Sequence, residues 1–520
     1  MLTAPDFDGS GDHGMKHQSR AASWRKRNCL LWTVLIVATM STSGCVFSPR
    51  MHVVTVAPDA RSFVETKSEQ PYVPWGTNYY DPNTGWYPQI WKQFDPDRVE
   101  RHFQVMSELG VNCARVFLAA AAFQPDVETI EEEALRKLDT LIKIARRAGI
   151  RLILTGPDHW EGEVPYWQPD RFAGEEALKA LENFWTVVGQ RYRDEPAILA
   201  WDLVNEPQMP WALDSWAPRW HTWLESKYQN FEGLKAAWDD ELEADEAWGS
   251  IEFAKDTAEQ DNPRLLDWQR FREHLADQWV ERQVKTIRSV DPTHMITIGY
   301  VQLSYPVVRP GDPHLYPAFN PRRQAQWLDF ISIHFYPLMG RPYGSRAQWD
   351  RNLAYLRSIL AYCHVGKPVV LGDYGWYGGG APQGRPLLTE EEQERWLHAE
   401  VEASRRLAHG WLSWPFADTP ESTDMSLFGG LVKPNMLVKV WAVRFRTYAR
   451  HLDVVPQPTP DLPDFDFEPA LTATLETMIA MQDEYAELVG KAVREAGPIP
   501  QMELELPEKK VAAPPLPGEE

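Results

Sequence analysis

The sequence is poor in cysteine, which excludes a fold built on disulfide bonds. Only 4 of the 520 residues are cysteine, and Cys29 and Cys45 precede the patterned part of the chain. The other two, Cys113 and Cys363, are too few for a disulfide framework. Cys113 lies in an apolar run, where we expect a buried free thiol. The sequence has neither an HExxH motif nor a Cys/His cluster with zinc spacing, so we predict no metal site and no cofactor.

Positive charge is also scarce, which argues against nucleic-acid binding. The formal net charge is −21 at pH 7, so the chain as a whole repels phosphate backbones. Affinity for nucleic acid depends largely on Lys and Arg neutralising those phosphates. A neutral polymer such as a polysaccharide meets no such repulsion, and a carbohydrate partner fits this composition.

The apolar run near the N-terminus is too short for a membrane-spanning helix. It covers residues 29–40, about 12 residues against the roughly 20 that a span needs. Arg25, Lys26 and Arg27 precede it, and small residues follow it up to Cys45. This is the order of a secretory signal, so we treat residues 1–50 as an N-terminal extension with a signal segment and expect export.

The end of this segment resembles a bacterial lipoprotein signal, in which the cysteine after small residues is lipidated. Thr42 stands where such signals usually carry Leu, so lipid anchoring at Cys45 and secretion both remain open. An uncleaved anchor would also place the rest of the chain outside the cytoplasm. Membrane contact is expected only through this N-terminal lipid or signal anchor.

From about residue 72 onward, short apolar runs alternate with amphipathic helical stretches. The residue patterns predict strands at 73–78, 111–117, 150–154, 198–204, 295–299, 330–334, 368–371 and 410–414. Eight strands with helices between them are typical of an α/β protein with a (β/α)8 TIM barrel. We therefore predict a barrel over residues 72–451.

Two parts of the chain depart from the bare alternation. About 85 residues separate strands four and five, where a βα unit needs roughly 30. We predict a helical insertion at about residues 208–290 that borders the substrate cleft on the top face. After His451 a proline-rich linker, one helix at 469–496 and a disordered tail form a C-terminal extension over residues 452–520. The insertion is rich in tryptophan: Trp211, Trp216, Trp220, Trp223, Trp238, Trp248 and Trp268.

Polar side chains gather where the predicted strands end, which is where active sites of such barrels lie. Two of them are carboxylates, Glu206 after strand four and Asp373 after strand seven. Two carboxylates facing each other across one cleft are what glycosidic cleavage needs: one protonates the leaving oxygen, and the other attacks the anomeric carbon or activates water. We expect Arg115 and His334 to keep the second carboxylate ionised while Glu206 stays protonated. The other candidates at strand ends are Asn205, His159, Trp160, Tyr336, Trp376 and Trp414.

This ordered set resembles glycoside hydrolase family 5, the retaining cellulases and mannanases, over roughly residues 72–451. The motifs that carry the resemblance are Gly76-Thr77-Asn78, Arg115, His159, Asn205-Glu206-Pro207, His334-Phe335-Tyr336-Pro337, Gly372-Asp373-Tyr374-Gly375 and Trp414. The resemblance implies that Glu206 is the acid/base and that Asn205 binds the sugar 2-hydroxyl. It also implies that Arg115 and Tyr336 tune the nucleophile, that His159 and His334 shape the central subsite, and that Trp414 stacks under the reacting sugar.

Trp160 and Trp376 also follow strand ends, and we predict that they bind substrate. Most of the other tryptophans are expected in the core. Asp202 lies deeper on the strand of Glu206, and we predict a structural role for it.

One departure from the family concerns the nucleophile, because Asp373 stands where the family has glutamate. The missing methylene withdraws the carboxylate by about 1.5 Å, and a misplacement of about 1 Å can cost roughly 100-fold in rate. Three interpretations stay open. The backbone adjusts and Asp373 still attacks, or the gap admits a water and the enzyme inverts, or the site binds sugar without cleaving it.

The insertion adds a second resemblance, to the β-galactosidase family 42 of the same clan. Residues 231–238, Phe-Glu-Gly-Leu-Lys-Ala-Ala-Trp, look like a segment that those enzymes carry after strand four. This keeps an exo-acting, galactosidase-like activity open. The expected function is therefore a glycosidase acting on a β-linked poly- or oligosaccharide. The alternatives are a non-catalytic carbohydrate-binding protein and, last, a structural envelope protein.

Overall fold

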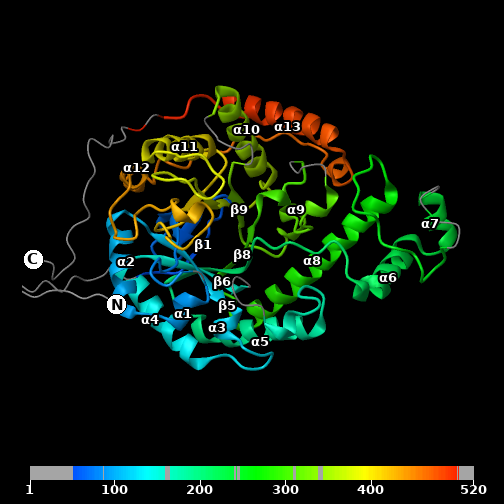
Figure 1. Ribbon diagram of the computed structural model, residues 1–520, viewed down its shortest axis with the longest axis horizontal. Coiled ribbons are helices and arrows are strands. Elements are labelled where there is room, and N and C mark those ends of the chain that lie inside the picture. The colour runs from blue at the N-terminus through cyan, green and yellow to red at the C-terminus, as the bar shows by residue number, and fades with distance from the viewer. Residues whose placement is uncertain are drawn as a thin grey trace, which may run out of the picture. The chain divides into compact units, whose positions relative to one another are not determined.

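The computed structural model describes residues 51–85, 87–158, 164–238, 242, 246–307, 312–337, 344–500 and 502. Within these residues, eight parallel strands form a closed barrel in the order β10-β11-β4-β5-β6-β7-β8-β9 (Figure 1). Strands that follow one another in the chain are therefore neighbours, and β11 closes the barrel onto β4. This confirms the predicted (β/α)8 architecture. The strands are β4 Trp75–Asn78, β5 Cys113–Ala119, β6 Arg151–Asp158, β7 Ile198–Asn205, β8 Met295–Tyr300, β9 Ile331–Phe335, β10 Val369–Tyr374 and β11 Gly410–Ser413.

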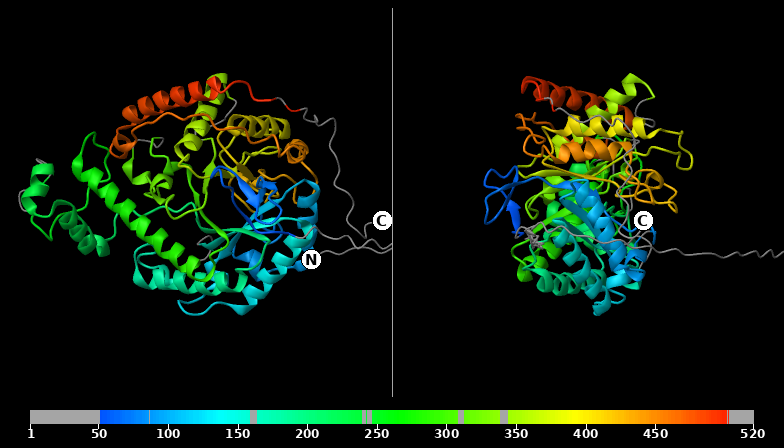
Figure 2. Two further views of the ribbon diagram at one scale, coloured as in Figure 1. Left: turned by 180° about the vertical axis from the view of Figure 1, so that it is seen from behind. Right: turned by 90° about the vertical axis from the view of Figure 1, so that its left-hand side faces the viewer.

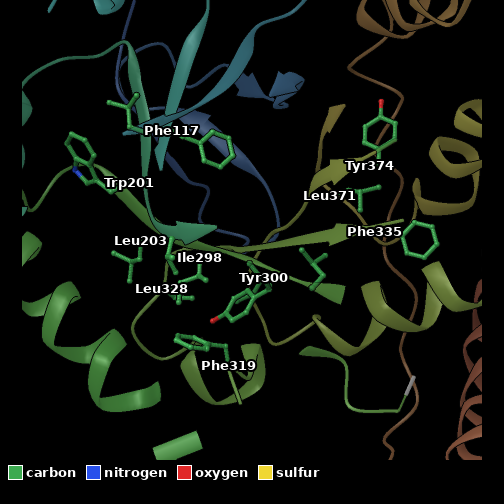
Figure 3. Packing of buried hydrophobic residues seen from close by; sticks show 14 of the residues in the cluster. Phe117, Trp201, Leu203, Ile298, Tyr300, Phe319, Leu328, Phe335, Leu371 and Tyr374 are labelled. Carbon is green, nitrogen blue, oxygen red and sulfur yellow. The ribbon is translucent and has the colours of Figure 1, made fainter. Parts of the chain in front are cut away.

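The barrel strands are apolar along most of their length because both of their faces are covered. All seven residues of β5 and all eight of β7 are buried. Side chains that point outward pack between strand and helix, as Leu203 of β7 does beside Ile298 and Tyr300 of β8 (Figure 3). Parallel sheets covered on both sides carry such continuous apolar runs.

Helices surround the barrel, and their ends match the signals read in the sequence. The fourth helix, α4, begins with Glu132 and Glu133 and stops at Gly149. The φ of Gly149 is 75°, in the left-handed region that favours glycine. Gly110, at φ 81°, follows α2 in the same way. The helices are α1 Gln89–Lys92, α2 Pro96–Glu108, α3 Ala120–Phe123, α4 Glu132–Ala148, α5 Glu175–Tyr192, α6 Ala217–Tyr228, α7 Phe231–Trp238, α8 Pro263–Val290, α9 Pro321–Gln324, α10 Arg346–Tyr362, α11 Glu390–Ser404, α12 Val440–Ala449 and α13 Leu475–Glu495.

The insertion between β7 and β8 is helical, as predicted, and consists mainly of α6, α7 and the long α8. Figure 1 shows α6 and α7 at the far end of α8, away from the barrel strands. Trp220, Trp238 and Trp268 are buried there, and the rings of Trp220 and Trp268 meet edge to face at 5.1 Å. Among the described residues of the insertion, none lines the active-site pocket. The described part of the insertion therefore lies outside the lining of this pocket, and its buried tryptophans belong to the same hydrophobic core as the barrel residues.

A three-stranded antiparallel sheet precedes the barrel, and the sequence analysis missed it. It consists of β1 Val54–Val56, β2 Phe63–Glu65 and β3 Pro71–Tyr72, the dark blue strands at one side in Figure 2. Val54, Phe63 and Tyr72 pack against the inward-facing residues at the N-terminal ends of the barrel strands, Cys113 and Phe330 included. The sheet therefore closes the end of the barrel opposite to the strand ends where the active site was predicted. Cys113 is buried and free, as expected.

The C-terminal extension lies against the barrel rather than apart from it. The carbonyl groups of the proline-rich segment accept hydrogen bonds from two arginines at the end of α11: Arg405 donates to Val454 and Val455, and Arg406 donates to Pro458. The predicted helix at 469–496 forms as a short 3-10 turn, Glu468–Leu471, followed by α13. The described residues from 51 onward belong to one compact unit.

Several expectations fall on parts of the chain that the structure does not describe. The signal segment with Cys45, the residues His159 and Trp160, and the tail after residue 502 lie outside the described residues. Within the described chain, we find no helix that is both long and apolar enough to span a membrane.

Candidate active site

The strand ends on one side of the barrel bring most of the predicted site residues together. Asn205 ends β7 and Glu206 follows it, His334 lies on β9, Asp373 on β10, and Tyr336 and Trp414 follow β9 and β11. One pocket of about 130 Å³ is lined by Tyr87, Phe117, Asn205, Glu206, Tyr336, Asp373, Trp414, Asp424 and Met425. The pocket thus holds both predicted catalytic carboxylates.

Glu206 occupies a strained position at the end of β7. Its φ is +44°, in the left-handed region that non-glycine residues rarely adopt. The peptide N–H of Glu206 donates to the carbonyl of Gly299 on the neighbouring strand at 2.7 Å, which holds this conformation. The side chain is 26% exposed and lies at the pocket. Strain of this kind clusters at functional sites because the surrounding structure must impose it.

Asp373 lies opposite, buried at the end of β10. The pairing of β10 with β9 shifts register between Leu371 and Asp373. Such a bulge bends the strand and re-aims a side chain. The Asp373 carboxylate lies 3.4 Å from Arg115 Nη1 and 3.2 Å from His334 Nδ1.

Burial dominates the electrostatics of Asp373. Removal from water raises the pKa of Asp373 to about 6, although His334 and Arg115 both act to lower it. Glu206 and Asp202 add to the rise as neighbouring carboxylates. We expected the two cationic neighbours to keep the pKa of this carboxyl low. The net direction is the opposite, because desolvation in the closed barrel outweighs them.

Arg115 is the centre of a buried hydrogen-bond network beneath the pocket. Its Nε and Nη2 atoms donate to Asp202 Oδ2 at 2.8 and 2.6 Å. Its Nη1 atom reaches Asn205 Oδ1 at 3.0 Å and Asn78 Oδ1 at 3.3 Å. Asp202 also accepts from Thr155 and from the Gly299 N–H. Asp202 therefore neutralises Arg115, in agreement with the structural role predicted for it, and Arg115 orients Asn205.

His334 lies between the two carboxylates. Its Nδ1 atom is 2.8 Å from Glu206 Oε1 and 3.2 Å from Asp373 Oδ2. Its other ring nitrogen is buried without a hydrogen-bond partner among the described residues. The His334 ring fits in this place because Gly299 and Gly372 have no side chain. A Cβ at Gly299 would lie 2.9 Å from His334 Nε2. His334 Nδ1 therefore lies within close reach of both carboxylates.

Two further predicted residues are held in place by side chains of loops at the same end of the barrel, Tyr336 by the loop after β8 and Trp414 by the loop after β11. The backbone of Tyr336 pairs with the Gln302 side chain, whose Oε1 accepts from the Tyr336 N–H at 2.6 Å and whose Nε2 donates to the Tyr336 carbonyl at 3.1 Å. Burial raises the pKa of the Tyr336 phenol well above its usual value, so the phenol stays protonated. The Trp414 indole donates to Ser426 Oγ at 2.9 Å.

Trp376 is placed differently from the other predicted site residues. Only 2% of it is exposed, and it is not among the described residues that line the pocket. Its ring lies beside Tyr377, with the Arg385 guanidinium 5.6 Å from the ring centre. The structure therefore does not bring Trp376 together with the catalytic pair.

The pocket also contains residues that the sequence analysis missed. Tyr87, Phe117, Asp424 and Met425 line it, and Gln302 positions Tyr336. In the sequence, Phe117 cannot be told apart from the other apolar residues of its strand. Tyr87 and Asp424 lie in loops, where no periodic pattern marks a functional residue. Asn78 was noted within a family motif without a role, and its amide donates to the carbonyls of Gly372 and Ser413.

Glu206, His334 and Asp373 form a compact donor set. One ligand atom from each lies within 4.8 Å of the others, close enough for all three to contact one cation. The same approach brings two carboxylates to opposite sides of one pocket, which is the arrangement that glycosidic cleavage uses.

Comparison with known proteins finds similarity to glycosidases. Residues 175–374 match the family model of the family 42 β-galactosidases. Mannan endo-1,4-beta-mannosidase 8 of Oryza sativa subsp. japonica is 22% identical over 319 residues, covering 54% of this chain and 69% of the relative. A probable mannan endo-1,4-beta-mannosidase A-1 of Aspergillus terreus is 28% identical over 200 residues, covering 33% of this chain and 50% of the relative. The chain thus spans between a half and about two thirds of the length of these curated relatives.

Solved structures share the fold at low identity. GH5_18 from Streptomyces cattleya in complex with GlcNAc superposes with a TM-score of 0.58 at 16% identity, covering 81% of this chain and 93% of that one. A cold-adapted β-galactosidase from Rahnella sp. R3 gives a TM-score of 0.62 at 16% identity, covering 80% and 64%. The closed barrel is the fold of these solved structures, and the chain is similar to family 5-like and family 42 (β/α)8-barrel glycosidases.

Proposed function

We propose that this protein hydrolyses β-linked poly- or oligosaccharides by a retaining mechanism, with Glu206 as acid/base and Asp373 as nucleophile. The observation that carries the proposal is the approach of the two carboxylates, whose nearest oxygens lie within 4.8 Å. Retaining pairs stand about 5–5.5 Å apart, whereas inverting pairs stand about 6.5–9.5 Å apart. An approach this close favours direct attack by Asp373 over attack by a water held between the two carboxylates.

The two steps follow from the positions of the groups. Glu206 donates its proton to the glycosidic oxygen while Asp373 attacks the anomeric carbon, so the bond to the leaving sugar breaks and a glycosyl ester forms. Glu206 then takes a proton from water, and the water oxygen displaces Asp373. Arg115 and His334 contact Asp373 and stabilise its carboxylate when it leaves.

The register shift in β10 supports a catalytic role for the shorter Asp373. It falls between Leu371 and Asp373, directly before the shortened side chain, and a bulge at that point re-aims this side chain. This favours the interpretation in which the backbone adjusts and Asp373 still attacks. Asn205 stands beside Glu206 at the pocket and is fixed by Arg115, which suits a ligand of the sugar 2-hydroxyl.

The relatives suggest which substrates to try first. Mannan endo-1,4-β-mannosidases recur among them, so β-1,4-mannan and manno-oligosaccharides lead the panel. The family 42 match over residues 175–374 makes aryl β-galactosides the second choice, and β-glucan completes the set. Export through residues 1–50 would place the protein where such polymers occur.

The test is hydrolysis of this panel by the wild type and by Glu206→Gln, Asp373→Asn and Asp373→Glu. We expect each of the first two changes to lower kcat by roughly 100- to 10,000-fold on the substrate that the wild type cleaves. Glu421→Gln is the matched control, because Glu421 is an exposed carboxylate outside the pocket lining. NMR of the first product should show retained configuration at the anomeric carbon.

Two results would contradict the proposal. Inverted product would mean that Asp373 activates water instead of attacking. Turnover that appears only in Asp373→Glu, with none in the wild type, would mean a barrel that binds sugar without cleaving it.

A further inference from the structure

A third carboxylate lines the catalytic pocket, and the two-carboxylate mechanism does not use it. Asp424 lies in the loop between β11 and α12 and shares the pocket with Glu206, Asp373 and Trp414. Its charge reaches the catalytic centre, since it is among the groups that raise the pKa of Tyr336. Like the catalytic pair, it is therefore within reach of a bound sugar.

The loop holds Asp424 in a fixed relation to Trp414. Asp424 Oδ1 accepts from the Ser426 N–H at 2.8 Å and from Ser422 Oγ at 2.6 Å. Ser426 Oγ in turn accepts from the Trp414 indole. Two polar links therefore join the carboxylate to the aromatic ring expected under the reacting sugar. A sugar that stacks on Trp414 would meet Asp424 in a reproducible geometry.

The two carboxylate oxygens of Asp424 differ in what they do. Both hydrogen bonds just described end on Oδ1, and this pairing caps the short turn Met425–Leu427. The second oxygen, Oδ2, is the acceptor that a ligand can use. Tyr87, Phe117 and Met425 supply the neighbouring wall with aromatic and thioether groups, which contribute contact area but no strong acceptor. Sugar hydroxyls are donors, and a carboxylate binds them more strongly than a neutral acceptor does.

We propose that Asp424 is a specificity-determining residue, whose Oδ2 accepts a hydrogen bond from a hydroxyl of the sugar unit on Trp414. This inference rests on the proposed function, because it concerns the sugar whose glycosidic bond is cut. It assigns to Asp424 the selection among sugars that differ in the configuration of one hydroxyl. The aromatic wall alone would accept such sugars almost equally.

Asp424→Asn separates the two roles of the side chain. Asparagine caps a turn about as well as aspartate, so Oδ1 keeps its partners while Oδ2 becomes an amide donor. We expect kcat/KM on the preferred aryl β-glycoside to fall roughly 10- to 150-fold, the range for losing one hydrogen bond to a charged group. The thermal midpoint should stay at the wild-type value. Ser422→Ala removes a support of Oδ1 outside the pocket lining and should change kcat/KM far less, and Glu421→Gln serves as the neighbouring charge control.

Deoxy substrates identify the hydroxyl and test the contact directly. Aryl β-glycosides lacking the 3-, 4- or 6-hydroxyl are compared on the wild type and on Asp424→Asn. For one deoxy compound, kcat/KM of the wild type should fall below its value on the parent glycoside by most of the roughly 10- to 150-fold factor given above. For the same compound, kcat/KM of Asp424→Asn should fall little. Equal losses on both proteins for every deoxy compound would overturn the inference.

The outcome is distinguishable from failure of the proposed function. Wild-type turnover combined with an unchanged Asp424→Asn variant contradicts this inference alone. If the wild type cleaves no glycoside, the proposed function fails. Calorimetric binding of the parent and deoxy monosaccharides to the wild type and to Asp424→Asn then decides the role of Asp424 by itself.

Discussion

At the scale of single residues, the pocket shows burial competing with charge. Arg115 and His334 lie beside Asp373 and act to lower its pKa, yet desolvation raises that pKa to about 6. Taking a carboxylate out of water is expensive, and one contact at 3.4 Å and one at 3.2 Å offset only part of this. The protonation of Asp373 therefore falls in the range of ordinary assay buffers.

The first prediction concerns the pH dependence of activity. Because Asp373 must be ionised to attack, kcat/KM should fall about tenfold per pH unit below a pKa near 6. The raised pKa of Asp373 contributes stability that is fully present below about 3.8 and is lost as the pH rises through about 6. Protonating this group therefore favours the folded state, and the acid loss of activity should appear while circular dichroism still shows folded protein. A flat profile down to pH 4 would contradict the assignment.

Gly299 shows how closely the network is packed. A Cβ on this residue would lie 2.4 Å from Arg115 Nη2 and 2.9 Å from His334 Nε2. We predict that Gly299→Ala displaces both side chains and lowers kcat roughly 100-fold, with a loss of about 1–3 kcal/mol in the free energy of unfolding. Gly490→Ala on α13 is the control, because there the added methyl meets only the flexible end of Arg494. Wild-type kcat in Gly299→Ala would show that the network tolerates displacement.

At the scale of elements, α11 carries a carboxyl group that the site does not use. Glu400 is fully buried behind β10, and neither of its oxygens has a well-formed hydrogen bond among the described residues. Burial raises the pKa of Glu400 well above its usual value, with the Trp396 indole as its polar neighbour. Glu400 is therefore neutral in the folded protein, whereas in the unfolded chain it ionises as the pH rises above about 4.5.

We predict that Glu400→Met stabilises the protein at neutral and alkaline pH by about 1–3 kcal/mol. In the wild type, the stability that the neutral carboxyl contributes is present at acid pH and is lost as the pH rises. The gain in stability from Glu400→Met should therefore shrink toward pH 4. Thermal unfolding midpoints at pH 4.5 and 8 measure it. Glu400→Gln keeps a buried polar group that does not titrate. It should therefore reduce the pH dependence of the unfolding midpoint without the gain in stability expected of methionine. A less stable methionine variant at pH 8 would mean that the carboxyl has a partner that it needs.

At the scale of the whole molecule, the two ends of the barrel have separate tasks. The strand ends hold the pocket, and β1–β3 cover the opposite end, where Phe63 meets Phe330 edge to face at 5.4 Å. The strands between them carry apolar residues along most of their length. Stability of the closed end and chemistry of the open end should therefore respond to different substitutions.

We predict that Phe63→Ala lowers the free energy of unfolding by about 3–5 kcal/mol, as deletion of a buried ring does. Its kcat/KM should remain at the wild-type value at temperatures where the variant is folded. Denaturant unfolding and steady-state kinetics on the same preparation provide both readings, with Phe63→Leu as a milder intermediate. Loss of activity in the folded variant would show that the covered end is coupled to the pocket.

Much of the fold follows from local pattern. The eight barrel strands, the stops at Gly110 and Gly149 and the helix near the C-terminus were all predicted, because apolar period and turn chemistry act over a few residues. The sheet β1–β3 was not, since its strands are two or three residues long and its apolar side chains find their partners only under the barrel. The placement of the insertion also depends on tertiary packing: its described residues lie outside the pocket lining, and several of its tryptophans pack against one another.

The sequence by itself determined the barrel, the residues at or just after its strand ends, such as Glu206, Asp373 and His334, and Arg115 within the second barrel strand. Strand ends of a parallel barrel meet at one side whatever the loops do. Only the tertiary structure decided how near the two carboxylates come, how far burial shifts the pKa of Asp373, and that Asp424 joins the pocket while Trp376 does not. Those properties depend on distances and dielectric surroundings that residues far apart in the chain create together.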